Sequence, residues 1–280
     1  MGVQARTPIT YEVRGGGTTH APMIIASVGG VEARLVLDTG SEVHLLNEDL
    51  ADELGLAKEP GEEGTDHSGA TMPSWNVGDV AMTMGGADLR LRDVVAIPAP
   101  PPFPSRGIRG ILSPQNLHPT LMTVIDMLAD ELLLVEGSDD EVADLLQARW
   151  PALGLLTLPR HGAFPSVVVP GSIEGFEEMP IMLNTGGKGT EFSSAAVPGL
   201  VVEASERLGA GVSGADYAGG SVGAGTLVLG GHRLTVPAVL IRQHMHDPQG
   251  MVGMDVLRGT VLACAADLSR PVYWMRPAEG

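Results

Sequence analysis

The stretch Val28–Gly40 reads VGGVEARLVLDTG and runs from a glycine turn through an apolar segment to the triplet Asp-Thr-Gly. A second stretch, Ile173–Gly186, reads IEGFEEMPIMLNTG and follows the same plan, ending in Asn-Thr-Gly. A glycine-containing turn followed by a short apolar run predicts a strand that leaves a hairpin. The recurrence of the whole pattern indicates an internal repeat.

Two further blocks repeat in the same order. Met84–Ile97 matches Leu229–Ile241, and Gly110–Leu117 matches Gly250–Leu257. The spacing between copies is nearly constant, and the proline-rich segment 97–105 accounts for most of the difference. Three blocks in one order indicate two homologous halves.

The halves set the expected domain organisation. Residues 1–136 are predicted to form an N-terminal lobe and residues 165–280 a C-terminal lobe, with residues 137–164 as the connector. The connector opens with Ser138-Asp139-Asp140-Glu141, a capping box that predicts a helix through Trp150.

Strands dominate the predicted secondary structure. They are short apolar or alternating runs bounded by turns, at Met23–Val28, Arg34–Leu37, Val80–Met84, Leu89–Ile97, Leu132–Val135, Ser166–Val169, Pro180–Leu183, Gly225–Leu229, Leu234–Ile241 and Val272–Met275. One helix is expected in each half, over Asn47–Leu56 and Val201–Leu208. We therefore predict an all-β protein with a few short helices.

Composition and charge exclude several classes of protein. Glycine and proline supply 38 and 21 of the 280 residues, which argues against a helical bundle, while 44% hydrophobic residues argue against disorder. The net charge is −17 and no basic cluster occurs, so we expect no nucleic-acid partner. No uncharged apolar run reaches the roughly 18 residues of a membrane span.

The sequence does not decide the cellular compartment. Cys264 is the only cysteine, so no intrachain disulfide can form, and it is interpreted as a small core residue. The N-terminal residues lack the apolar stretch of a signal peptide. The protein is expected to be either cytoplasmic or exported with its signal trimmed.

The repeated motifs resemble the aspartic proteases. Leu35–Ser41 (LVLDTGS) is similar to their catalytic loop, and Gly110–Leu112 and Gly250–Gly253 are similar to a second signature that supports it. Two copies resemble the bilobal pepsin-like arrangement, built here from retropepsin-like motifs. The resemblance implies two β-barrel-like lobes with a peptide-binding cleft between them, and endopeptidase action on an extended polypeptide. It implies a monomer that needs no metal or cofactor.

The resemblance also implies a role for each loop residue. In the family, two carboxyls share a proton and activate one water molecule, so neither can be assigned its own pKa. The implied residues are Asp38 and Asn184 at the catalytic positions, Thr39, Gly40, Ser41, Thr185 and Gly186 in the supporting loops, and Trp75 and Tyr217 as flap candidates. For Trp75 the alternative is an edge-strand tryptophan, and for Tyr217 a plain loop.

Asn184 departs from the family pattern. An amide is nearly isosteric with a carboxyl but cannot deprotonate, so the shared proton is lost. Loss of a positioned acid–base partner reduces rates by about 10²–10⁴-fold. We expect a chain that binds peptides and cleaves them poorly or not at all. Asn184 is either an engineered replacement or a natural loss. The isosteric choice and the otherwise intact Leu183–Gly186 motif favour the replacement, whereas smaller departures at Gly187 and Ser113 favour natural loss.

Two functions therefore remain open. The first is an aspartic endopeptidase inactivated at one position, and the second is a non-catalytic peptide-binding or regulatory module on the same scaffold. His244 and His246 could suggest a metal, but no further ligand lies in register, and an exposed polar loop is the preferred interpretation.

Overall fold

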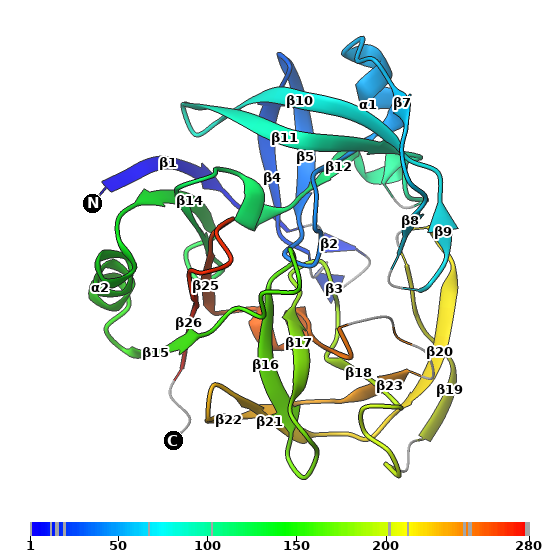
Figure 1. Ribbon diagram of the computed structural model, residues 1–280, viewed down its shortest axis with the longest axis vertical. Coiled ribbons are helices and arrows are strands. Elements are labelled where there is room, and N and C mark those ends of the chain that lie inside the picture. The colour runs from blue at the N-terminus through cyan, green and yellow to red at the C-terminus, as the bar shows by residue number, and fades with distance from the viewer. Residues whose placement is uncertain are drawn as a thin grey trace.

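The computed structural model describes residues 2–11, 13–14, 17–18, 21–66, 68–101, 103–200, 203–211, 213–242, 245 and 248–277, without the side chains of 13–14, 17–18, 203–210 and 217. It confirms an all-β fold with a few short helices, arranged in three main sheets (Figure 1). His244 and His246 lie outside the described residues.

The first sheet closes into a barrel. Its strands are β4 (Met23–Val28), β5 (Val31–Leu37), β6 (Leu45–Asn47), β7 (Glu59–Pro60), β10 (Trp75–Met84), β11 (Ala87–Ile97) and β12 (Ile108–Leu112). They follow the order β11-β6-β12-β5-β4-β10-β7, and β11 also pairs with β10. This second pairing of β11 closes six strands into a barrel, with β7 attached outside it.

The second sheet repeats this order. Its strands are β16 (Val168–Ile173), β17 (Met179–Leu183), β18 (Glu191–Ser193), β19 (Glu203–Ala210), β20 (Asp216–Ser221), β21 (Gly225–Leu229), β22 (His232–Val236), β23 (Leu240–Arg242) and β24 (Gly250–Val252). In this sheet β18, β24, β17, β16 and β21 take the places that β6, β12, β5, β4 and β10 have in the first sheet. The long strand β11, which pairs with both β6 and β10, is replaced by two strands: β23 beside β18, and β22 beside β21. The predicted helix over Val201–Leu208 is wrong in its described part, because residues 203–210 pair with β20 as strand β19.

A third sheet combines strands from both halves and the connector. Its strands are β1 (Gly2–Pro8), β13 (Met122–Asp126), β14 (Glu131–Glu136), β15 (Leu153–Leu158), β25 (Val261–Cys264) and β26 (Val272–Pro277). Their order is β1-β14-β13-β25-β26-β15, so the halves meet where β13 pairs antiparallel with β25. Two small ribbons, β2 (Val13–Arg14) with β3 (Gly17–Thr18) and β8 (Gly64–Thr65) with β9 (Thr71–Met72), complete the strands.

The helices are short. They are α1 (Glu48–Glu53), α2 (Asp139–Arg149) and α3 (Met254–Leu257), with 3₁₀ turns at Pro104–Arg106 and Pro114–Asn116. Helix α2 confirms the capping box, since Ser138 accepts the Glu141 N–H and Glu141 accepts the Ser138 N–H. In the part of the chain described, α2 is the longest helix at 11 residues, too short to cross a bilayer.

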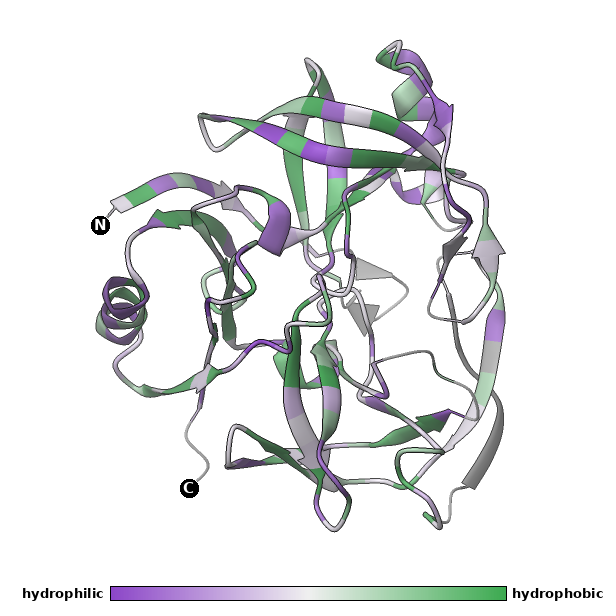
Figure 2. Ribbon diagram, viewed as in Figure 1, coloured by the Kyte–Doolittle hydropathy of each residue, from purple (hydrophilic) through white to green (hydrophobic). Residues whose placement is uncertain are grey.

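Burial follows the strand pattern. Strands β10 and β11 alternate between hydrophilic and hydrophobic residues, whereas β14 is almost uniformly hydrophobic (Figure 2). The reason is that β14 is covered on both faces: Leu132 and Leu134 join the main core, and Leu133 and Val135 join a second cluster under α2.

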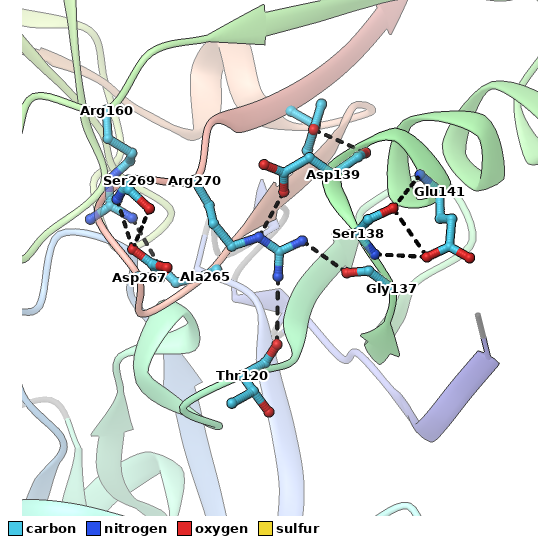
Figure 3. A network of polar contacts seen from close by, with 11 residues as sticks. Thr120, Gly137, Ser138, Asp139, Glu141, Arg160, Ala265, Asp267, Ser269 and Arg270 are labelled. Atoms are coloured by element: carbon cyan, nitrogen blue, oxygen red, sulfur yellow. Dashed lines mark hydrogen bonds and ion pairs between the residues drawn. The ribbon is translucent and has the colours of Figure 1, made fainter.

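Two arginines tie the connector to the C-terminal segment (Figure 3). Arg270 donates to the Asp139 carboxylate at 2.7 Å and to the Gly137 carbonyl at 3.1 Å. Arg160 donates to the Ala265 carbonyl at 3.0 Å. Guanidinium groups present several donors in a fixed plane, so each arginine can hold more than one segment in place.

Candidate active site

The two triplets lie at the ends of corresponding strands. Asp38 follows β5, and its N–H donates to the Leu112 carbonyl of β12 at 2.9 Å. Asn184 follows β17, and its N–H donates to the Val252 carbonyl of β24 at 2.8 Å. Each strand is paired in parallel with the strand that carries the second motif. The second motif therefore supports the backbone from which each triplet begins.

The threonines of the two triplets join them. Thr39 N–H donates to Thr185 Oγ1 at 3.1 Å, and Thr185 N–H donates to Thr39 Oγ1 at 3.0 Å. Each hydroxyl also donates to the strand before the other triplet, Thr39 to Leu183 O at 2.5 Å and Thr185 to Leu37 O at 2.8 Å. Both side chains are fully buried. The four bonds fix the relative position of the two loops.

At this junction Asp38 lies against Gly186 of the second loop, and Asn184 lies against Gly40 of the first. A Cβ added at Gly186 would overlap the Asp38 carboxylate, and one added at Gly40 would lie 2.8 Å from Cγ of Asn184. Each loop therefore lies against the site side chain of the other. Asp38 is half-buried and Asn184 is 9% exposed, so the pair lies in a partly dehydrated place.

The two site side chains are held in related ways. Asp38 Oδ1 accepts the Gly40 N–H at 2.8 Å, and Asn184 Oδ1 accepts the Gly186 N–H at 2.8 Å. Asn184 Oδ1 also accepts the Gly187 N–H at 3.0 Å, and its Nδ2 contacts the sulfur of Met251 at 3.1 Å. The amide oxygen thus occupies the position of a carboxylate oxygen, whereas the Nδ2 group donates where a carboxylate would accept.

Close packing explains the glycines of the second motif. A Cβ at Gly110 would lie 2.5 Å from the Leu45 carbonyl oxygen, and one at Gly250 would lie 2.7 Å from the Phe192 ring. A Cβ at Gly253 would overlap the backbone of Gly189. In the first half Ser113 stands in that place, with its hydroxyl accepting from Asn116 Nδ2 at 2.9 Å.

One comparison with known proteins matches part of the first half. A family model described as aspartyl protease matches residues 24–113. The match includes Asp38, Thr39 and Gly40 together with the second motif at Gly110–Leu112, and it ends before Asn184. A search of curated proteins found no significant relative.

The structure also places the backbone of the remaining predicted residues. The Ser41 N–H donates to the Asp38 carbonyl at 3.1 Å, and its hydroxyl donates to the Val43 carbonyl at 2.7 Å. Trp75 begins β10, where it pairs with Pro60 and Ala96 just after the β8–β9 ribbon. The Tyr217 backbone pairs with Gly209 in β19–β20, and the Tyr217 side chain lies outside the described part.

His44 is a buried titratable group within the matched residues 24–113, and it is absent from the residues predicted above. Its Nδ1 accepts the Ser113 N–H at 3.3 Å, and its Nε2 lies 3.2 Å from the Asn116 carbonyl oxygen. The ring is therefore neutral, with its proton on Nε2. Burial lowers the pKa of His44 to about 4. The hydrogen bond to Asn116 raises this pKa, but by less than burial lowers it. Nothing in the sequence around His44 indicates this environment.

Proposed function

We propose that this chain is built as a bilobal aspartic-type endopeptidase with lobes 1–136 and 165–280, and that Asn184 leaves it with one carboxyl of the catalytic pair. The substrate is an extended polypeptide lying between the lobes. The observation that carries the proposal is the reciprocal bonding of Thr39 and Thr185, beside which each of Asp38 and Asn184 lies against a glycine of the other's loop. The aspartyl protease match over residues 24–113 supports it.

The chemistry follows from the side chains. In the complete pair, one carboxylate takes a proton from water while the other carboxyl protonates the carbonyl oxygen of the scissile bond. Asp38 can supply one of these functions. Asn184 can orient a water or a carbonyl oxygen through its NH₂ group, but it cannot exchange a proton. The expected result is peptide binding with cleavage reduced by at least about 100-fold.

The Asn184→Asp variant tests this function. Because the chain carries a net charge of −17 at pH 7, a basic unfolded probe such as reduced and alkylated lysozyme avoids electrostatic repulsion at neutral pH. We expect Asn184→Asp to cleave this probe between pH 3 and 8, at least about 100-fold faster than the parent chain. The matched control adds Asp38→Asn, which should abolish the cleavage.

One contact favours the second candidate, a peptide-binding module without catalysis. The amide of Asn184 uses both ends, with Oδ1 accepting two backbone N–H groups and Nδ2 directed at the Met251 sulfur. A carboxylate would direct an acceptor at that sulfur, so the site accommodates an amide well. If Asn184→Asp binds the lysozyme probe but cleaves nothing across the pH range, the binding module is the correct assignment.

A further inference from the structure

Asn184 carries an amide at a site proposed to hydrolyse amides. Its side chain ends in a primary amide, and the peptide bond of a substrate is a secondary one. Addition of one water molecule to the side chain, with loss of ammonia, turns asparagine into aspartate. The contacts made by the two ends of this amide, and by the residues beside it, favour that reaction in the folded chain.

The oxygen end of the amide lies between two backbone donors. Oδ1 accepts the Gly186 N–H at 2.8 Å and the Gly187 N–H at 3.0 Å. When water adds to the carbon of an amide, the oxygen gains negative charge, and donors about 2.7–3.1 Å away stabilise that charge. Removing one such donor from an enzyme typically slows its reaction by about 10²–10³-fold. Gly186 and Gly187 thus favour the addition of water to Cγ of Asn184.

The nitrogen end of the amide is held more weakly. Nδ2 donates to the Met251 sulfur at 3.1 Å, and a thioether sulfur is a weak acceptor. The nitrogen must take up a proton before it leaves as ammonia, and a contact to sulfur costs little to break at that point. The amide is therefore polarised at its oxygen and loosely bound at its leaving group.

Two glycines connect Asp38 to this amide. The Gly40 N–H donates to Asp38 Oδ1 at 2.8 Å, and a Cβ at Gly40 would lie 2.8 Å from Cγ of Asn184. The Gly186 N–H donates to Asn184 Oδ1, and a Cβ at Gly186 would overlap the Asp38 carboxylate. Each glycine therefore contacts both side chains, one through its N–H and the other at its α-carbon. Asn184 keeps 9% of its surface exposed and Asp38 is half-buried, so water reaches both.

The usual route of asparagine deamidation is closed at this position. In flexible peptides the backbone nitrogen of the following residue attacks the side-chain carbon and forms a cyclic imide, which opens to aspartate and isoaspartate. Here that nitrogen belongs to Thr185, which is fully buried and whose N–H donates to Thr39 Oγ1 at 3.0 Å. Ring closure at Asn184 would break the threonine junction. Direct addition of water is the route that the fold leaves open.

We propose that Asn184 is a self-deamidation site, at which Asp38 acts as the general base and residue 184 becomes an aspartate. The Asp38 carboxylate takes a proton from a water molecule, and the water oxygen bonds to Cγ of Asn184. The Cγ–Nδ2 bond then breaks, and the nitrogen leaves as ammonia with the proton that Asp38 had taken. The product is a carboxylic acid beside the Asp38 carboxylate, so the two groups share the one proton that the catalytic pair needs.

This inference rests on the proposed function, because it uses the same carboxylate and the same kind of bond. It adds that the chain is synthesised with an incomplete pair and completes the pair with time. One general base is enough for this step, since each molecule undergoes the reaction once and no second cycle has to follow. Asn184 is then the precursor of the second aspartate.

Mass spectrometry measures the conversion without any substrate. The folded chain is kept for weeks at pH 5–7 in water labelled with heavy oxygen, and trypsin in ordinary water then cuts after Arg160 and Lys188. In the peptide 161–188, Asn184 is the one residue with a side-chain amide, so both the conversion and the label are assigned to it directly. We expect one heavy oxygen atom at residue 184, in aspartate without isoaspartate.

Two variants and one internal reference isolate the contribution of Asp38. Asp38→Asn keeps the shape of the loop and should slow the conversion by at least about 100-fold, because it removes the general base. Asp267→Asn, at an exposed turn, should keep the parental rate. Within the parent chain Asn47 is also buried, but its Oδ1 has no hydrogen-bond donor among the described residues, so it should remain an amide.

Three results would overturn the inference. The first is an Asn184 that stays an amide in the folded parent for as long as Asn47 does. The second is isoaspartate at residue 184, which would show ring closure. The third is an equal rate in the parent and in Asp38→Asn, with urea titration showing that both are folded.

The proposed function fails by a different result. If Asn184→Asp cleaves no probe while the parent still takes up heavy oxygen at residue 184, deamidation stands and proteolysis does not. If Asn184→Asp cleaves the lysozyme probe and the parent takes up no label, proteolysis stands and deamidation does not.

Discussion

Thr39 and Thr185, 146 residues apart, each donate a backbone N–H to the hydroxyl of the other. Each hydroxyl then donates to the strand that precedes the opposite triplet. Neither triplet can move without breaking hydrogen bonds made by the other. The relative position of Asp38 and Asn184 is consequently a property of the junction, and both halves must be folded for it to exist.

Removing one hydroxyl should therefore weaken the whole molecule. Thr185→Val leaves the Thr39 N–H and the Leu37 carbonyl buried without these partners, and we expect a loss of about 1–3 kcal/mol in the free energy of unfolding. Urea titration measures it. Thr185→Ser keeps the hydroxyl and should lose much less. Thr83→Val, whose hydroxyl bonds Asp88 on an exposed strand, should change the value by under about 0.5 kcal/mol.

Gly186 should tolerate no side chain. In Gly186→Ala the added methyl group would overlap the Asp38 carboxylate, and relieving this overlap should cost about 1–3 kcal/mol and displace Asp38. Thermal unfolding and binding of the alkylated lysozyme probe check both effects. Gly162→Ala is the matched control, because a Cβ there meets nothing within 4 Å and neither glycine has a positive φ. Equal stability of the two variants would contradict the close approach of the loops.

His44 should make the fold sensitive to acid. The folded chain keeps the imidazole neutral down to its pKa of about 4, whereas the unfolded chain takes up the proton near 6.5. Stability is therefore complete above about pH 6.5 and falls as the pH drops towards 4, by roughly 3 kcal/mol. Below about pH 4 both states are protonated and this loss stops.

A neutral replacement isolates this contribution. In His44→Gln, Oε1 can accept from Ser113 and Nε2 can donate to Asn116 without titrating. We expect the difference in unfolding free energy between pH 7 and pH 4.5 to shrink relative to the parent chain. His232→Gln, at an exposed position on β22, should leave that difference unchanged. A His44 variant with the parental pH dependence would refute the assignment.

A buried ion pair distinguishes the second half from the first. Arg242 and Glu191 lie 3.5 Å apart and are almost completely buried, whereas the corresponding strand positions in the first half are Ile97 and Leu45. Arg242→Ile alone leaves a buried carboxylate, so we expect a loss of about 3–5 kcal/mol. Adding Glu191→Leu should recover most of it, since an apolar pair of similar size often replaces a buried ion pair without loss. A double-mutant cycle in urea checks this coupling, and additive losses would contradict it.

Tertiary pairing explains where the structure differs from the sequence pattern. Residues 203–208 are rich in helix-favouring side chains, yet pairing with the glycine-rich β20 makes them strand, because tertiary pairing outweighs weak local propensity. The third sheet does not follow from the local sequence pattern, because it joins β13 to β25 across more than a hundred residues. No local period encodes which strand a buried apolar run will choose as its neighbour.

The sequence by itself determined the repeated strand-to-triplet pattern, the all-β class and the capped connector helix. Each of these features depends on residues that are close together in the sequence, such as those of a turn, a helix cap or an alternating strand. Only the tertiary structure decided that the triplets meet through Thr39 and Thr185, and that His44 is buried and accepts the Ser113 N–H. These contacts depend on how two separately patterned halves dock. Docking depends on side-chain packing and on hydrogen bonds from backbone N–H groups. Every residue except proline carries such a group, so the sequence does not show which of them will bond across the two halves.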